Sequence, residues 1–455
     1  MKDYQQPSPD LASETAPTEF SVARSDFPEG FVFSTATSAY QIEGHAFGGA
    51  GETHWDAFAR QPGKVHLQQH GAVACDHYHR WEEDLDLIRD VGLDAYRFST
   101  SWARVMPDGV TLNPEGLDFY DRLVDGLLQR GIKPMATLYH WELPQALSEK
   151  GGWLVRKTPE AFARFTDVVA RRIGDRLHNV APVNEPWCVA WLSHYHGAHA
   201  PGLTGLENGV RSMHNVALAH GLSVEVLRAH GVPGVGAACN MEFPLPARDT
   251  DEDRAAARLY DGIYNRWFVQ AMTRGTYPED VLEGFAPHMP EGWEKDLERI
   301  HAPLDWFGVN YYTCQRLQAQ SDRWPYYSTV PGPLPKTDMG WEIAPEGLEW
   351  LLLRTAADFT GDTPLYVTES GMANPDVPGR ADVERIAYLD GHFRAGLRAI
   401  ERGAPLAGYT VWSLMDNYEW AFGYDKRFGM VHVDFDSQRR TPKASWHALG
   451  RMLRR

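Results

Sequence analysis

Apolar and β-branched residues occur along this chain in short unbroken runs that alternate with stretches of helical periodicity. The runs are continuously apolar rather than alternating, which is typical of strands buried on both faces. The pattern therefore predicts parallel strands connected by helices. The predicted strands are Gly30–Ala39, Leu93–Ser99, Ile132–Tyr139, Asn179–Asn184, Gly234–Met241, Leu304–Asn310, Pro364–Thr368 and Leu406–Trp412.

The segments between these runs carry helix start and stop signals. Trp81, Leu85, Ile88 and Val91 share one helical face, and Gly92 follows as a cap. Asn-Pro and Thr-Pro pairs are typical of a helix start, with proline in the first turn. Two such helices are predicted to begin at Asn113-Pro114 and at Thr158-Pro159. A further predicted helix runs from Val383 to Gly403.

Repeated strand–helix alternation predicts the fold. Eight such units close a (β/α)8 barrel of the TIM type, with long loops after the strands. An open doubly wound sheet is the alternative, disfavoured because no Gly-x-Gly-x-x-Gly follows an early strand. No linker-like break interrupts the pattern, so we expect one domain over residues 19–455. Residues 1–18 are polar and aperiodic, which predicts a disordered tail.

Composition limits the partners and the compartment. Asp and Glu number 61 against 44 Lys and Arg, and the net charge of −17 disfavours nucleic acid or an anionic membrane as a partner. No apolar run approaches the roughly 20 residues of a membrane span, and the N-terminus lacks a secretory pattern. The scattered Cys75, Cys188, Cys239 and Cys314 disfavour a disulfide framework. We therefore expect a cytoplasmic protein.

Two predicted strands run directly into a glutamate. Pro364–Thr368 ends at Glu369, and Asn179–Asn184 ends at Glu185. Either acid alone has a plain interpretation as a solvated residue, but in a barrel the C-terminal strand ends carry the chemistry, so the pair is expected to meet. A carboxyl against apolar walls keeps its proton, whereas one bonded to cations stays ionised. Glycoside cleavage needs one protonated and one ionised carboxyl group.

Further polar and aromatic residues are expected at the same strand ends. Each alone has a structural interpretation, as a turn residue, an ion-pair partner or a core residue. Together their amide, imidazole and phenol groups suit neutral sugar hydroxyls, and an indole face suits the C–H face of a pyranose. They are Gln41, Arg97, His140, Trp141, Asn184, Asn310, Tyr311, Tyr312 and Trp412.

Specific motifs then identify a family resemblance. They are Phe31–Gly44, Asp76–Asp84, Tyr96–Trp102, His140–Pro144, Asn184–Pro186, Asn310–Tyr312, Tyr366–Gly371 and Trp412–Trp420. With them the chain resembles glycoside hydrolase family 1, the β-glucosidase and β-galactosidase family of (β/α)8 barrels. The resemblance covers Phe27 to about Leu449.

The resemblance implies roles for individual residues. Glu185 would be the acid/base and Glu369 the nucleophile of a retaining mechanism, with carboxyl groups about 5–5.5 Å apart. Arg97, Asn310 and Tyr312 would support Glu369 and hold it ionised. The residues implied to bind substrate are Gln41, His140, Asn184, Tyr312, Trp341, Trp412, Glu419 and Trp420, and Trp187 would lie beside the leaving group. No cofactor and no metal is implied.

The implied function is a retaining exo-β-glycosidase of the β-glucosidase type. It would release terminal nonreducing β-D-glucosyl residues, and by extension galactosyl or fucosyl ones, from oligosaccharides or aryl and alkyl glucosides, as in cellulose degradation. The expected partner is such a small glycoside. Neither nucleic acid nor membrane is expected, and a homo-oligomer is left open.

Two alternatives are weighed against this function. A sugar-binding barrel without turnover is disfavoured because both carboxylates are present. A 6-phospho-β-glycosidase is disfavoured because Glu419 would repel a 6-phosphate, although Lys426 lies in roughly the right region. Glu185 also argues against a thioglucosidase, since those tend to carry Gln at that position.

Four positions depart from the usual family pattern. Ser370 stands where Asn is usual, Glu142 where Asp is usual, Pro182 where Thr is frequent, and Ser34 where Gly is common. None removes a catalytic group. Ser370 and Pro182 are the two that we expect to alter how the carboxylates are held.

Two further signals are discounted. The histidine clusters lack a third ligand at metal-binding spacing, so His77, His79, His196 and His199 are expected to be structural. The acidic run Glu82–Asp84 is expected to be the solvated face at a helix start.

Overall fold

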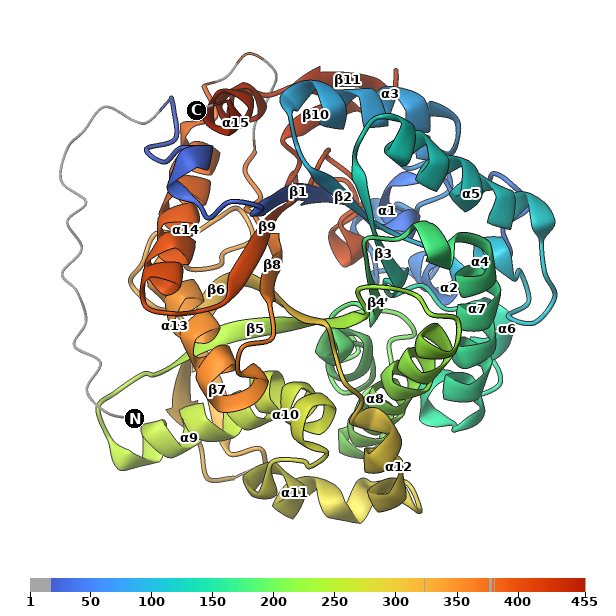
Figure 1. Ribbon diagram of the computed structural model, residues 1–455. Coiled ribbons are helices and arrows are strands. Elements are labelled where there is room, and N and C mark those ends of the chain that lie inside the picture. The colour runs from blue at the N-terminus through green and yellow to red at the C-terminus, as the bar shows by residue number, and fades with distance from the viewer. Residues whose placement is uncertain (1–17, 323, 376–378, 380, 455) are drawn as a thin grey trace.

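Within the described residues, eight parallel strands form the centre of the molecule and helices surround them, as the computed structural model shows (Figure 1). The structure describes residues 18–322, 324–375, 379 and 381–454, so the predicted tail lies outside the described residues apart from Thr18. The barrel strands are β1 (Val32–Ala36), β2 (Ala95–Ser99), β3 (Lys133–Tyr139), β4 (Asn179–Val183), β5 (Gly236–Pro246), β6 (Trp306–Ala319), β8 (Leu365–Ser370) and β9 (Leu406–Trp412).

The sheet closes on itself. Its strands pair in the order β4-β3-β2-β1-β9-β8-β6-β5, and bridges from Val180 to Val235 and from Asn184 to Ala238 join β4 to β5. A sheet whose two edges pair is a barrel, which confirms the predicted (β/α)8 fold over the open doubly wound sheet. The β4–β5 seam is sparse because Pro182, between the two bridges, has no N–H to donate.

The helices predicted from start and stop signals in the sequence are present in the structure. The outer layer contains α3 (His77–Val91), α5 (Pro114–Gln129), α7 (Lys157–Ile173), α8 (Leu206–Ala229), α13 (Pro345–Thr355), α14 (Val383–Glu401) and α15 (Ala444–Leu453). Gly92 caps α3 directly after Val91, and its φ of 95° is a conformation that glycine adopts without strain.

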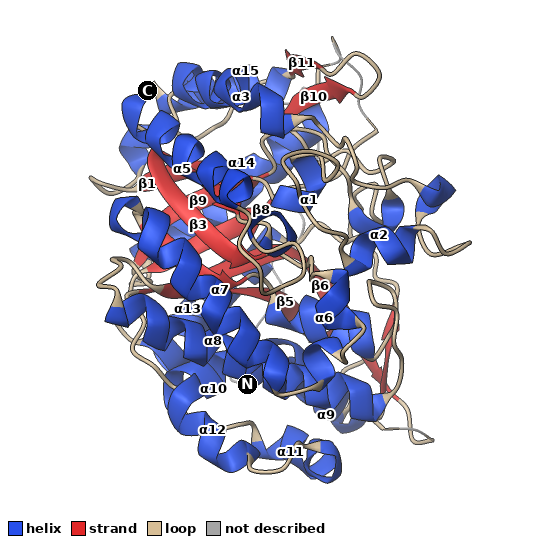
Figure 2. Ribbon diagram, turned by 90° about the vertical axis from the view of Figure 1, so that its right-hand side faces the viewer, coloured by secondary structure: helices blue, strands red, loops and turns tan. Residues whose placement is uncertain are grey.

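Shorter helices occur in the connections. They are α1 (Ala39–Ile42), α2 (His54–Ala59), α4 (Trp102–Val105), α6 (Gln145–Ser148), α9 (Asp251–Asp261), α10 (Trp267–Arg274), α11 (Glu279–Phe285) and α12 (Trp293–Ile300). None of the helices in the described ranges combines the length and apolarity that crossing a bilayer takes. Figure 2 shows α1 and α2 among the loops that gather at one end of the barrel.

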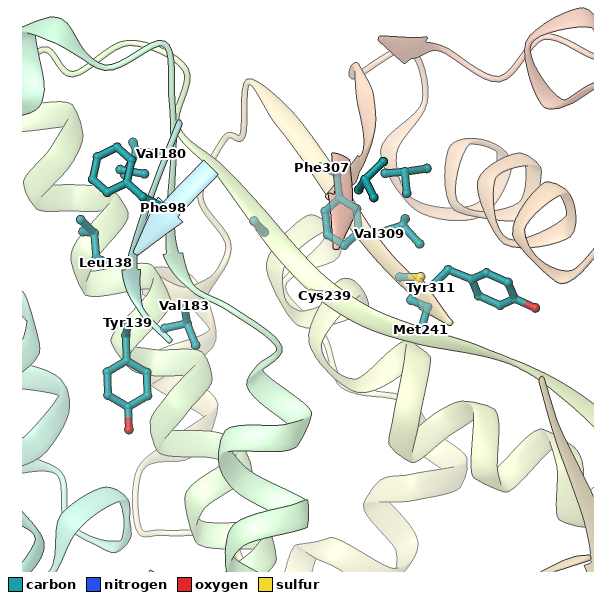
Figure 3. Packing of buried hydrophobic residues seen from close by; sticks show 14 of the residues in the cluster. Phe98, Leu138, Tyr139, Val180, Val183, Cys239, Met241, Phe307, Val309 and Tyr311 are labelled. Carbon is teal, nitrogen blue, oxygen red and sulfur yellow. The ribbon is translucent and has the colours of Figure 1, made fainter. Parts of the chain in front are cut away.

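Side chains alternate between two environments along each barrel strand, because successive residues of a strand point to opposite faces. Phe307, Val309 and Tyr311 of β6, with Cys239 and Met241 of β5, belong to the large apolar cluster that joins the barrel to its helices (Figure 3). Both faces of the strands are therefore buried.

The intervening positions face the barrel axis. Away from the carboxyl ends they form a small apolar layer of Val32, Ala95, Met135, Ala181, Ala238, Trp306 and Tyr366. Large and small residues interlock here: a Cβ on Gly236 would lie 2.3 Å from the Trp306 ring. Nearer the carboxyl ends of the strands, the residues on this inner face are polar. The alternation of side chains therefore places these polar groups together at one end of the barrel.

Several strand boundaries differ from the prediction. β1 ends at Ala36, and α1 already begins at Ala39, within the predicted strand. β5 and β6 run on to Pro246 and Ala319, well past their predicted ends, and β6 also pairs antiparallel with β7 (Tyr327–Val330). Polar residues alternate with apolar ones in these extensions, which is why the sequence did not predict them. The hairpin of β10 (Val431–Asp434) and β11 (Arg439–Pro442) was likewise not predicted.

The prediction of a solvated acidic run at Glu82–Asp84 is wrong for Asp84. Its carboxylate is fully buried and bonded to His77 Nδ1 at 2.8 Å and to Arg440 Nε at 2.9 Å. Arg440 belongs to β11, so this ion pair fixes the C-terminal hairpin to α3. Burial alone would raise the pKa of Asp84, but the hydrogen bonds from His77 and Arg440 outweigh it and lower that pKa.

Candidate active site

A pocket of about 530 Å³ opens at the carboxyl ends of the barrel strands, a size typical of small-molecule sites. Among the described residues, four carboxyl groups line it: Glu185, Glu242, Glu369 and Glu419. Carboxyl groups gathered in a largely buried space cannot share one protonation state, because each disfavours ionisation of the others. The contacts of each group therefore decide its chemistry.

Glu369 lies near the end of β8 and is 3% exposed. Arg97 Nη1 donates to its Oε1 at 2.6 Å, and the Tyr312 hydroxyl donates to its Oε2 at 2.7 Å. Each carboxylate oxygen thus accepts one charge-assisted hydrogen bond, which fixes the orientation of the group. Arg97 and Tyr312 contact Glu369 directly, as the family resemblance implies.

Glu185 follows β4 and is held differently. Its backbone has a φ of 49°, a left-handed conformation unusual for a non-glycine residue, and its N–H donates to Ala238 O on β5 at 2.9 Å. Its Oε1 accepts a hydrogen bond from Asn310 Nδ2 at 2.8 Å. Burial, and then the charge of Glu369, raise the pKa of Glu185 to about 8. This carboxyl therefore holds its proton at neutral pH.

A continuous hydrogen-bonded chain connects the two acids. Asn184 Oδ1 accepts from Arg97 Nη2 at 2.6 Å and from Asn310 Nδ2 at 3.0 Å. Arg97 holds Glu369, and Asn310 holds Glu185. The orientation of the two carboxyl groups is thereby coupled through Asn184.

His140 lines the pocket and keeps one buried ring nitrogen without a partner among the described residues. Asn184 Nδ2 donates to its Nε2 at 3.2 Å, so the ring proton resides on Nδ1, which has no partner among the described residues. Burial, and then the charge of Arg97, lower the pKa of His140, and the imidazole is neutral. Its free N–H suits a neutral acceptor such as a sugar hydroxyl.

Aromatic rings wall the pocket. The rings of His140 and Trp412 stack 5.6 Å apart, and those of Trp141 and Trp420 are 4.9 Å apart. The Trp341 ring lies 5.5 Å from the Tyr312 ring. Such flat apolar faces accommodate the C–H surface of a sugar ring.

Glu419 has support from Gln41. Gln41 is fully buried, and its Nε2 donates to Asn417 Oδ1 at 3.0 Å and Tyr418 O at 2.8 Å, with Glu419 Oε2 at 3.5 Å. Burial, and then the charges of Glu369 and Glu185, raise the pKa of Glu419 to about 8. Gln41 thus positions the loop that carries Glu419.

Most predicted site residues meet at this pocket, but not all line it. Those that do are His140, Trp141, Glu185, Trp187, Asn310, Tyr312, Trp341, Glu369, Trp412, Glu419 and Trp420. Gln41, Arg97 and Asn184 are buried behind these residues and act by holding them.

Other residues lining the pocket were not predicted. They include Asn240, Glu242, Tyr260, Tyr264, Gln315 and Thr329. Asn240 lies on β5 within the predicted strand, and the others lie on the extensions of β5 and β6, on β7, or on helical turns that pack against them. The spacing of Ala238, Asn240 and Glu242 could have predicted that Asn240 and Glu242 point to the same side, because alternate residues of one strand share a face.

The departures from the family pattern lie outside the pocket lining. Ser370 is buried beside the hydroxyls of Tyr388 and Tyr409. Glu142 is also buried, and burial followed by the charge of Glu43 raises its pKa, which keeps it neutral.

His196 and His199 also line the pocket. Burial lowers the pKa of His199 to about 3, so it is neutral. In the part of the chain that the structure describes, no three His, Cys, Asp or Glu residues gather as metal ligands would.

Comparisons with known proteins agree with this geometry. Residues 23–453 match the model of Glycosyl hydrolase family 1. β-Glucosidase A of Thermotoga maritima is 43% identical over 432 residues, which cover 93% of this chain and 97% of that protein. A bifunctional β-D-glucosidase/β-D-fucosidase of Bifidobacterium breve is 44% identical, covering 94% of this chain and 98% of the relative.

A solved structure is also similar. The family 1 β-glucosidase of Thermotoga maritima in complex with isofagomine lactam superposes with a TM-score of 0.90 at 42% identity. The match covers 95% of this chain and 99% of the other.

Proposed function

This chain belongs to glycosyl hydrolase family 1, and from that membership we propose that it is a retaining β-glucosidase with Glu369 as nucleophile and Glu185 as acid/base. The observation that carries the proposal is the contrast between the two carboxyl groups. Glu369 accepts hydrogen bonds from a guanidinium and a phenol, whereas burial and a neighbouring charge raise the pKa of Glu185 to about 8.

The first half-reaction uses this contrast. Glu369 attacks the anomeric carbon of a β-glucoside and forms a covalent ester, while the bond from that carbon to the leaving oxygen breaks. Glu185 transfers its proton to the leaving oxygen, so the leaving group departs as a neutral alcohol. The expected carboxyl separation of about 5–5.5 Å stays a prediction of this mechanism.

The second half-reaction needs Glu185 to act as a base. The charge of Glu369 is one cause of the raised pKa of Glu185, and that charge is lost when Glu369 becomes an ester. The pKa of Glu185 then falls, so its carboxylate accepts a proton from the attacking water. Water displaces Glu369 and releases the sugar with its original β configuration.

The residues around the catalytic pair fit a neutral sugar. His140 brings a neutral imidazole to the pocket wall, Glu419 a carboxyl group and Trp412 a flat indole face. A 6-phosphate does not fit as well, because the nearby cation Lys426 already pairs with Asp338 at 2.9 Å and Asp425 at 3.0 Å.

Hydrolysis of a panel of 4-nitrophenyl β-glycosides, with cellobiose and lactose, tests the proposal. We expect the glucoside to be hydrolysed, and Glu369→Gln to lose activity on the order of 10⁴-fold or more. Full activity of that variant would contradict the assigned nucleophile. Calorimetry that finds tight sugar binding without hydrolysis would favour a binding protein, and preference for the 6-phosphoglucoside would favour a phosphoglycosidase.

The finer expectations remain predictions from the sequence. They are action on galactosides, a place in cellulose degradation, a cytoplasmic location and self-association. Acceptance of fucosides is supported by the Bifidobacterium breve relative, which is named for that activity.

A further inference from the structure

Trp341 and Met339 reach the pocket from a turn between β7 and α13. The Thr337 N–H donates to Trp341 O at 2.9 Å, and the Gly340 N–H donates to Thr337 O at 2.9 Å. Residues 337–341, here called the Trp341 turn, therefore keep their own shape through backbone hydrogen bonds. These local bonds do not fix the distance between the turn and the rest of the pocket, which depends on its neighbours.

The Trp341 turn packs against the loop that follows β9, residues 413–430, here called the β9 loop. This loop carries Glu419, and its Phe428 ring lies 6.1 Å from the Trp341 ring. Phe428 and Trp341 also belong to one apolar cluster with Trp412. The turn and the loop thus form adjoining parts of the pocket wall.

Both segments also contact the residues that follow β8. The Asp338 N–H donates to Ala373 O at 3.1 Å, and the Asn374 N–H donates to Arg427 O at 3.2 Å. Ala373 lies four residues beyond Glu369 in the sequence. The Trp341 turn, the β9 loop and the end of β8 therefore meet beside the strand that carries the proposed nucleophile.

An ion pair connects the Trp341 turn to the β9 loop directly. Lys426 Nζ lies 2.9 Å from Asp338 Oδ2, across 88 residues of sequence, and 3.0 Å from Asp425 Oδ2. The side chains of Lys426 and Asp338 are 17% and 27% exposed, so the pair is only partly screened by water. Asp425 belongs to the β9 loop itself, and Asp338 is the partner that joins the two segments.

Lys426 carries its charge in this setting. Burial alone would lower the pKa of Lys426, but the hydrogen bonds to Asp338 and Asp425 outweigh it and raise that pKa. Neither Lys426 nor Asp338 lines the pocket. Any effect of the pair on a substrate must therefore pass through the wall residues that it holds in place.

We propose that the ion pair between Asp338 and Lys426 holds the Trp341 turn against the β9 loop, which makes both residues positioning residues for the binding of β-glucosides. The inference rests on the proposed β-glucosidase function and adds to it a dependence of KM on ionic strength. Without the pair the turn is free to move away from the loop, while Glu185 and Glu369 keep their own partners. Loss of such binding, made equally in the ground state and the transition state, raises KM and leaves kcat unchanged.

Salt separates this role from a purely structural one. A β-glucoside is neutral, so salt does not alter its electrostatic attraction to a chain of net charge −17. The Debye length shortens from about 10 Å at roughly 0.1 M salt to about 3 Å at roughly 1 M, which weakens a partly exposed ion pair. We therefore expect KM of the wild type for 4-nitrophenyl β-glucoside to rise about twofold over this range.

The test measures kcat and KM at both salt concentrations for the wild type, Asp338→Asn, Lys426→Met and the double variant. We expect each single variant to raise KM about two- to fivefold at low salt, to keep kcat within about twofold, and to lose the salt response. The double variant should add nothing further, because the two side chains act as one pair. Asp338→Asn retains the backbone N–H that donates to Ala373.

Asp425→Asn is the matched control. It removes the other partner of Lys426 on the same loop and leaves the link to Asp338 intact, so KM and its salt response should match the wild type. Lys426→Arg keeps the charge and should also retain the salt response.

An unchanged KM in both single variants, a loss confined to kcat, or a salt response that persists in Asp338→Asn would overturn the inference and leave the proposed function standing. Asp338→Asn decides the question if Lys426→Met does not fold. A wild-type chain that hydrolyses no β-glucoside would overturn the proposed function, and this inference with it.

Discussion

At the scale of single residues, the site works by giving two glutamates opposite surroundings. Glu369 accepts from Arg97 and Tyr312, whereas Glu185 is bonded to a neutral amide of Asn310 and feels the charge of Glu369. Pairs of acids whose environments separate their protonation states are the usual basis for dividing acid and nucleophile roles.

The raised pKa of Glu185 leads to a prediction for Glu185→Gln. The acid must be protonated to act, so for the wild type kcat/KM on cellobiose should fall as the pH rises through about 8. Removing the acid should lower that value about 10²- to 10⁴-fold. A 2,4-dinitrophenyl glucoside, whose leaving group departs without a proton, should lose far less and show no such alkaline limb in the variant. Steady-state kinetics across pH measure both, and equal losses on the two substrates would contradict the assignment.

The sequence predicted which residues belong to the site better than how each one acts. Glu185 and Glu369 could be identified from the sequence because each directly follows an apolar run. That Gln41 and Asn184 bind the sugar stays a prediction. The contacts that hold them depend on long-range neighbours, since Asn184 Oδ1 is occupied by Arg97 and Asn310, and no local pattern contains that information.

At the scale of elements, the strand ends decide the shape of the pocket. The sequence predicted all eight barrel strands, because apolar runs and helix punctuation are local signals. It missed the extensions of β5 and β6, which are stabilised by pairing with each other and with β7. Glu242 lies on such an extension, so it was not among the predicted site residues.

The end of β8 leads to a prediction for Gly371→Ala. A Cβ at this position would lie 1.7 Å from the backbone oxygen of Trp412, so β8 and β9 must separate. Glu369 lies two residues away, and a displacement of about 1 Å costs roughly 10²-fold in rate. We expect kcat/KM on a nitrophenyl glucoside to fall by about that factor and the melting temperature to drop. A fully active Gly371→Ala would contradict the tight contact.

At the scale of the whole molecule, stability depends on buried groups whose partners are far apart in sequence. Asp84 and Arg440 are separated by 356 residues, and only the closed barrel brings them together. Helix periodicity placed Asp84 on a solvated face because it contains no information on such a partner. Removing the guanidinium would leave the buried Asp84 carboxylate with His77 but without its arginine partner, and breaking a buried ion pair in this way costs about 3–5 kcal/mol.

Buried histidines predict how the stability changes with pH. Burial lowers the pKa of His54, His194, His199, His220 and His392 to about 3, 4, 3, 4 and 4. In the unfolded chain a histidine titrates near 6.5, so unfolding takes up protons below that pH. The contribution of these neutral histidines to the free energy of unfolding is fully present above about pH 6.5. It is lost as the pH falls toward 4, by up to about 1.4 kcal/mol per pH unit for each residue.

Denaturant unfolding between pH 4.5 and about 8 measures this dependence. We expect the free energy of unfolding to stay level above about pH 7 and to decrease steadily below about pH 6.5. Stability that remains constant down to pH 4.5 would contradict the burial of these neutral imidazoles.

The central claim is that Glu369 becomes covalently attached to the sugar. A 2,4-dinitrophenyl 2-deoxy-2-fluoro-β-glucoside retains a good leaving group for the first step, while its fluorine slows the hydrolysis of the ester. Mass spectrometry of the intact and digested protein should then find one fluoroglucosyl unit per chain, on the peptide that contains Glu369. A label on Glu185, or inactivation without any covalent label, would contradict the account.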